Sequence, residues 1–193
     1  MSWWESLVQV RCADGEKGTG TLISPTEILT AAHVVSRNGQ TFEPGELTLD
    51  LRFLSRVAVA LGVSVLPAWA ASGGASNDIA LIKVEPEANL GVAPVFGVPA
   101  LNGSAMLEGY GFEAQNDTEQ RLSGNVSCSA GPGGQPLLFT HDFAPIPGMS
   151  GGPVCVGLPS GVHVAGILIR QSSSGLVGLS VTAAVLARLR QGF

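Results

Sequence analysis

Short runs of hydrophobic residues, many of them alternating with polar ones, recur along most of this chain. The clearest is ELTLDLRFL, residues 46–54, in which polar residues separate Leu47, Leu49 and Leu51. This period of two places one face of a β-strand on a core and the other in solvent. Many short strands with turn residues between them predict an all-β protein. We expect strands over residues 6–12, 18–24, 27–31, 46–54, 78–84, 104–112, 121–128, 136–140, 153–157, 162–169 and 175–181.

Two segments differ from this pattern. The longest hydrophobic run, residues 57–71, is fifteen residues long and contains a glycine and a proline. It is too short for a membrane-spanning helix, and its β-branched residues predict one or two buried strands. Residues 182–193 carry hydrophobic residues at helical spacing and end with arginines in the last turn, which predicts a C-terminal helix.

A break in the pattern divides the strands into two sets of similar size. Residues 86–103 are rich in proline and glycine and show little periodicity. We therefore expect an N-terminal β-barrel over residues 1–90 and a C-terminal β-barrel over residues 91–193, the second ending in the helix. The two together would form one domain.

Composition and charge exclude several classes of function. The chain has 193 residues, is 45% hydrophobic and carries a formal charge of −5, with its ten lysines and arginines scattered. No basic face is evident, so nucleic acid is not an expected partner. The three cysteines show no metal-binding spacing, so we expect buried thiols, at most one disulfide, and neither metal nor cofactor. No signal-peptide pattern opens the chain, which favours a cytoplasmic protein without a membrane partner.

The strongest chemical signal is PIPGMSGGPVC, residues 145–155, where glycines surround Ser150. Glycine reaches backbone angles closed to other residues, so this loop can aim the amides of Gly148 and Ser150 at one point beside the serine hydroxyl. A serine nucleophile for acyl transfer needs such donors. A glycine-rich hairpin without chemistry is the alternative interpretation.

Two further residues could complete a nucleophilic site. His33, in ILTAAHVV, follows a predicted strand and two alanines that leave room around the imidazole. Asp78, in SNDIALIKV, stands at the mouth of a buried strand, where a carboxylate is costly unless it is paired. Alone, each has an ordinary explanation: a structural histidine, and a cap on the turn at residues 76–77. Together with Ser150 they provide the base and the orienting acid that acyl transfer requires.

The motifs TAAH, DIAL and GMSGGP, in this order, resemble the chymotrypsin/trypsin-like serine peptidases, including their HtrA-like bacterial branch. GTGTLIS, EGYGF, HVAGILI and GLVGLSV resemble further strands of that family. The resemblance implies two six-stranded antiparallel barrels with the active site between them. It also implies that Ser150 attacks the scissile carbonyl, His33 transfers the proton and Asp78 orients His33. The amides of Gly148 and Ser150 would then bind the oxyanion of a protein or peptide substrate.

The same resemblance suggests a substrate-binding pocket without a carboxylate. Its expected lining residues are Ala144, Leu168, Ile169, Arg170 and Ser180. We expect a small or medium apolar residue before the cut, unless Arg170 projects inward and selects an acidic one.

Two residues depart from the pattern of the secreted members. Met149 replaces the acid that serves zymogen activation, and Val34 replaces a cysteine that often forms a disulfide. Three alternatives to a constitutive peptidase stay open. The chain could be a non-catalytic binding module on this fold, a peptidase whose oxyanion loop is collapsed until a regulatory protein partner or a peptide ligand binds, or an esterase.

Overall fold

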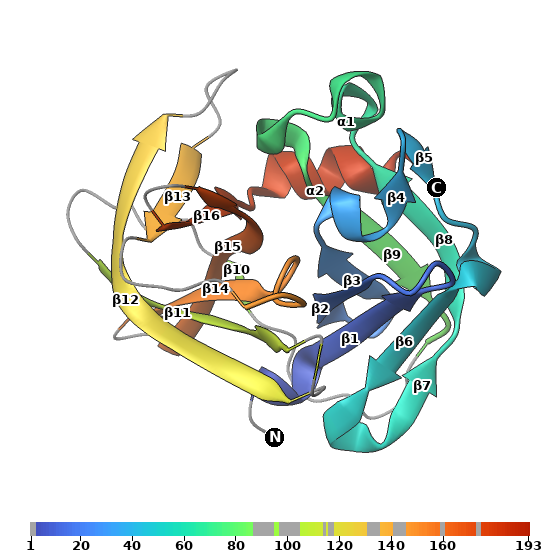
Figure 1. Ribbon diagram of the computed structural model, residues 1–193, viewed down its shortest axis with the longest axis horizontal. Helices are drawn as coiled ribbons and strands as arrows, with labels where there is room; N and C mark the ends of the chain where they lie inside the picture. The colour runs from blue at the N-terminus through green and yellow to red at the C-terminus, as the bar shows by residue number, and fades with distance from the viewer. Residues whose placement is uncertain are drawn as a thin grey trace.

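Strands and short helices follow one another along the described chain. The computed structural model describes residues 3–86, 95–96, 105–113, 115, 118–130, 136–140, 146–158, 161–172 and 175–193. Two curled sheets lie side by side, with short helices around the first (Figure 1). In this part of the chain no helix has the length and hydrophobicity needed to cross a bilayer.

The N-terminal half builds the first sheet. Its strands are β1 (Leu7–Cys12), β2 (Lys17–Ser24), β3 (Glu27–Thr30), β6 (Leu47–Leu51), β7 (Arg56–Ala58), β8 (Ala60–Val65) and β9 (Ala80–Val84). They pair antiparallel in the order β7-β6-β1-β2-β3-β9-β8. The alternation in ELTLDLRFL is confirmed in β6, where Leu47, Leu49 and Leu51 are buried.

The C-terminal half builds the second sheet. Its strands are β10 (Val95–Phe96), β11 (Ala105–Phe112), β12 (Glu119–Ala130), β13 (Pro136–Thr140), β14 (Pro153–Leu158), β15 (Gly161–Ser172) and β16 (Gly175–Ser180). Their order is β10-β15-β14-β11-β12-β13-β16, and β16 also pairs with β15. Only the β10–β15 pair is parallel among these pairings.

Each sheet has seven strands, where the family resemblance implies barrels of six. In the first sheet, one segment of the chain breaks at Val59 into β7 and β8, which lie at opposite edges. In the second sheet, the two-residue strand β10 adds to one side of β15. The all-β class is confirmed, and the count of six strands per barrel stays a prediction.

The prediction of buried strands over residues 57–71 is wrong in two respects. Val57 of β7, Val59 in the break after it and Leu61 of β8 are 60, 51 and 50% exposed, so one face of this segment is toward solvent. Both strands lie at edges of the sheet. The end of the run forms helix α1 (Pro67–Ser72) instead of a strand. Pro67 stands at the first turn of this helix, and Gly73, with a φ of 61°, ends it.

Shorter elements connect the strands. They are the 3-10 helices η1 (Trp3–Ser6), η2 (Ala32–Val34), η3 (Pro44–Glu46), η4 (Arg52–Leu54) and η5 (Ala75–Asn77), and the hairpin of β4 (Ser36–Arg37) and β5 (Gln40–Thr41). The predicted strand over residues 46–54 is therefore shorter than expected, since η4 replaces its end. The predicted strand over residues 78–84 begins only at Ala80.

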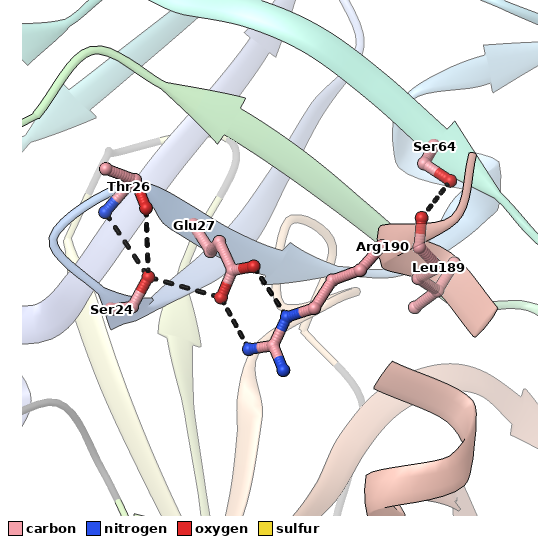
Figure 2. Close-up of polar contacts among 6 residues, drawn as sticks. All are labelled: Ser24, Thr26, Glu27, Ser64, Leu189 and Arg190. Carbon is pink, nitrogen blue, oxygen red and sulfur yellow. Dashed lines mark hydrogen bonds and ion pairs between the residues drawn. The ribbon is translucent and has the colours of Figure 1, made fainter. Parts of the chain in front are cut away.

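The predicted C-terminal helix is confirmed as α2 (Ala183–Arg190), and it packs on the first sheet. The buried residues Val185, Leu186 and Leu189 belong to the same hydrophobic cluster as the strands β1, β3 and β9. Figure 2 shows the polar contacts of its last turn, where the Ser64 hydroxyl donates to the Leu189 carbonyl at 2.7 Å.

An ion pair adds to this attachment. The Arg190 guanidinium donates through Nε and Nη2 to the two carboxylate oxygens of Glu27, each at 2.7 Å (Figure 2). Ser24 also donates to Glu27, at 3.2 Å. The hydrogen bond from Arg190 holds the pKa of Glu27 below its ordinary value. The helix thus ties the end of the second half to the first sheet.

Candidate active site

His33 lies in η2, directly after strand β3. Ala31 and Ala32 are fully buried, and Ala31 is extended, with a φ of −81° and a ψ of 144°. Small side chains at these two positions let the chain turn from the strand into the 3-10 helix against the core. The imidazole itself remains 37% exposed.

Asp78 ends η5, two residues before β9 begins, and its side chain is only 6% exposed. Its Oδ1 accepts the backbone N–H of His33 at 2.9 Å, and its Oδ2 lies 2.7 Å from His33 Nδ1. Since an ionised carboxylate can only accept, Nδ1 carries the proton, and Nε2 of the neutral ring is left as an acceptor. Both carboxylate oxygens therefore accept hydrogen bonds from His33, and within the described residues neither accepts one from the turn at residues 76–77.

Helix α1 is linked to the segment that carries His33 by two hydrogen bonds. The indole Nε1 of Trp69 donates to the Ser36 hydroxyl at 2.9 Å, and that hydroxyl donates to the Ala32 carbonyl at 2.6 Å. Ser36 is buried, so its hydrogen bond to the Ala32 carbonyl is shielded from water. These two bonds fix η2 relative to helix α1.

Ser150 lies in the loop before β14, which is orange in Figure 1 and reaches toward β2. Three of its amides are bonded: Met149 donates to Ile146 at 3.2 Å, Gly151 to Leu168 at 2.7 Å and Gly152 to Met149 at 2.9 Å. Within the described residues, the amides of Gly148 and Ser150 donate to no backbone carbonyl. The two amides that the sequence singles out are thus without a backbone acceptor among the residues that the structure describes.

Two glycines of this loop have backbone angles that disfavour other residues. Gly148 has a φ of 99° and Gly151 a φ of 84°. A Cβ on Gly151 would also overlap the Thr19 carbonyl oxygen and the Thr30 hydroxyl. Glycine is therefore required at 151 for the loop to pass this close to β2 and β3.

His33, Asp78 and Ser150 line one cleft of about 330 Å³. Its other walls are Trp69, Gly73, Ala75 and Ile169. The structure thus brings the three predicted residues to one place, although they come from distant parts of the chain. Trp69 was not expected here, because its segment was predicted as strand. The Pro67 and Gly73 that bracket α1 are the signal that could have indicated a helix.

The predicted specificity residues are only partly brought together. Ile169 lines the cleft, whereas Leu168 is 2% exposed and binds the Ser150 loop through its backbone. Ser180 is also 2% exposed. Ala144 and the side chain of Arg170 lie outside the described residues. The preference for the residue before the cut therefore stays a prediction.

The cysteine predictions hold where they can be checked. Cys12 and Cys155 are buried, and the Cys128 side chain lies outside the described residues. Cys12 Sγ donates to the Val34 carbonyl at 3.0 Å, and burial together with nearby Asp14 raises its pKa to about 12. A Cβ on Gly18 would lie 2.5 and 2.6 Å from the two Val34 methyl carbons, so the Val34 side chain packs directly against the backbone of β2.

Comparison with known proteins identifies the family. A model described as "Trypsin-like peptidase domain" matches residues 18–162, which include His33, Asp78 and Ser150. The chain belongs to this family. The resemblance drawn from TAAH, DIAL and GMSGGP is thereby confirmed, and as a trypsin-like peptidase the protein is a serine endopeptidase acting on protein or peptide substrates. No curated protein sequence matches it significantly.

Solved structures of serine proteases share the fold of this trypsin-like peptidase. A Glu endopeptidase in complex with MPD is 18% identical, with a TM-score of 0.78 over 97% of this chain and 90% of that one. The thermostable protease AL20 from an extremophilic microorganism is 14% identical, with a TM-score of 0.71 over 96 and 94%. The Rv3671c protease from M. tuberculosis, in its active form, is 20% identical, with a TM-score of 0.65 over 98 and 81%.

Proposed function

We propose that this serine endopeptidase cleaves peptide bonds through a triad of Ser150, His33 and Asp78 and an acyl-enzyme intermediate. One observation carries the proposal: the carboxylate of Asp78 lies 2.7 Å from His33 Nδ1, on a cleft that Ser150 also lines. This pairing leaves Nε2 of His33 free to accept a proton from a serine hydroxyl.

The proposed reaction has two halves. Ser150 Oγ attacks the scissile carbonyl while His33 takes the hydroxyl proton, and His33 then donates that proton to the departing amine. Water repeats the sequence on the acyl-enzyme, releases the acid product and restores Ser150. Asp78 stabilises the imidazolium that forms in each half, and its burial keeps water from competing for the ring N–H.

The oxyanion of each tetrahedral intermediate would bind the amides of Gly148 and Ser150. In support, neither amide donates to a backbone carbonyl among the described residues. A donor of this kind typically contributes about 3 kcal/mol to the transition state.

We propose a small or medium apolar residue before the scissile bond. The described walls of the cleft beyond the triad are Trp69, Gly73, Ala75 and Ile169, none of which carries a charge. An acidic residue at this position, selected by Arg170, is the second candidate. The name Glu endopeptidase concerns that protein alone, since a likeness at 18% identity reports only the fold.

Covalent labelling with a small fluorophosphonate, followed by intact mass spectrometry, tests the proposal. We expect one adduct on the wild type and none on Ser150→Ala or His33→Ala. Casein, peptide libraries and simple esters then separate a peptidase from an esterase. An unlabelled wild type that is folded would refute a constitutively active site. Labelling that returned only with an added protein partner would identify the gated enzyme.

A further inference from the structure

Thr19, in strand β2, is fully buried and takes part in four hydrogen bonds, two of which go to the Ser150 loop. Its backbone N–H donates to the Ser150 carbonyl at 2.8 Å, and its hydroxyl donates to the Gly148 carbonyl at 2.8 Å. The same hydroxyl accepts the backbone N–H of Phe112 at 3.0 Å. The Thr19 carbonyl accepts the Thr30 hydroxyl at 2.7 Å.

The direction of the bond to Gly148 is fixed by chemistry. A hydroxyl has one proton, and a backbone N–H can only donate. Because the Phe112 N–H occupies a lone pair of Thr19 Oγ1, the hydroxyl proton is directed to the Gly148 carbonyl. One residue therefore holds the carbonyls on both sides of Met149 against β2.

Gly148 needs such a constraint. Glycine has more backbone conformations open to it than any other residue, and Gly148 has a φ of 99°. Because each peptide unit is planar, a fixed Gly148 carbonyl also fixes the peptide unit that follows Gly148. The Gly148 N–H lies in the preceding unit, so its direction then depends only on rotation about the two backbone bonds of the Gly148 Cα.

A second glycine allows the contact to form. A Cβ on Gly111 of β11 would lie 3.0 Å from Thr19 Oγ1 and 2.9 Å from the Met149 Cα. Glycine at this position lets β2, β11 and the Ser150 loop meet directly around the threonine hydroxyl.

We infer that Thr19 is a positioning residue of the oxyanion site. By binding the Gly148 and Ser150 carbonyls on the side of β2, it keeps the amides of these two residues directed toward the substrate. The inference rests on the proposed function, because it assigns Thr19 a role at that same site.

The variant Thr19→Val tests it, since valine has nearly the same shape and lacks the hydroxyl. We expect the rate constant for fluorophosphonate labelling to fall by about 10- to 100-fold, somewhat less than is usual when an oxyanion donor is removed outright. With a cleaved peptide we expect kcat to fall while KM stays unchanged, because the oxyanion forms only after binding. Thr19→Ser keeps the hydroxyl and should restore the rate.

Thr21→Val is the matched control. Thr21 is also fully buried in β2, but its hydroxyl has no hydrogen-bond partner in the described part of the chain. The Thr21→Val variant should react with the fluorophosphonate at the wild-type rate. Thermal unfolding shows whether each variant is folded. Thr19→Ala is measured beside Thr19→Val, so that the inference can still be tested if the valine variant does not fold.

Each result has one meaning. A folded Thr19→Val or Thr19→Ala that labels as fast as the wild type overturns the inference. So does a Thr19→Ser variant that loses as much rate as Thr19→Val, or an equal loss in Thr21→Val. An unlabelled wild type overturns the proposed function and this inference with it, whereas an equally labelled Thr19 variant overturns this inference alone.

Discussion

Replacing Asp78 by asparagine should invert the tautomer of His33 while leaving the fold intact. The carboxylate accepts two donors of His33, the backbone N–H at 2.9 Å and the ring Nδ1–H at 2.7 Å. An amide has one accepting oxygen and one donating nitrogen. The backbone N–H cannot give up its proton, so the amide oxygen faces it and the amide nitrogen faces Nδ1. The ring must then carry its proton on Nε2, where it cannot accept one from Ser150.

The expected loss is large in rate and small in stability. A histidine held in the wrong tautomer lowers kcat by about 10⁴-fold in triads of this kind, or about 5.5 kcal/mol of transition-state stabilisation. The amide keeps a partner for each neighbouring donor or acceptor, so the midpoint of thermal unfolding should change little.

The assay is the second-order rate of fluorophosphonate labelling, with thermal unfolding measured on the same sample. Asp78→Ala is the comparison variant, because it leaves the His33 backbone N–H without an acceptor and should lose stability as well as rate. A folded Asp78→Asn protein that labels within tenfold of the wild type would refute the tautomer argument.

Three further predictions test other parts of the molecule. Arg190→Gln should lower stability near neutral pH by about 0.5–1 kcal/mol, because Arg190 is 51% exposed. Since the pKa of Glu27 is lowered from 4.5 in the folded state, thermal unfolding should show this difference above pH 4.5 and lose it as the pH falls through the lowered value. Gly151→Ala should cost about 2 kcal/mol or more, because its Cβ overlaps the Thr19 carbonyl at a φ of 84°; a denaturant midpoint equal to that of the wild type would contradict this. Cys12, with a pKa of about 12, should resist iodoacetamide at pH 8 until the protein unfolds, as peptide mapping would detect.

The sequence predicts most of the strands because their hydrophobic alternation is a local property. Leu47, Leu49 and Leu51 of β6 are buried as the period of two requires. The same reasoning fails at residues 57–71, since β-branched residues indicate a strand without indicating how many of its faces are covered. Val57 lies in the edge strand β7 and Val59 in the break that follows it, and both are exposed. Which strands lie at an edge depends on the pairing of distant segments.

The candidate site shows a similar division. His33, Asp78 and Ser150 could be proposed because each has a chemistry that stands out beside alanines or glycines. Thr19 and Trp69 could not, since a threonine in a strand and a tryptophan in a hydrophobic run have ordinary explanations. Their roles depend on hydrogen bonds between residues distant in the sequence. Thr19 reaches Gly148 in the other half of the chain, and Trp69 reaches Ser36 within the first half.

The attachment of helix α2 to the first sheet has a consequence for biosynthesis. Residues 183–190 leave the ribosome after every strand of both sheets, yet they fill part of the core beneath β8 and β9. The sheet that carries His33 and Asp78 therefore keeps apolar surface uncovered until the strands around Ser150 have also been made. A nascent chain that already contains all three residues still lacks this part of its core. The order of synthesis thus delays a fully packed peptidase until after the entire proposed triad has emerged.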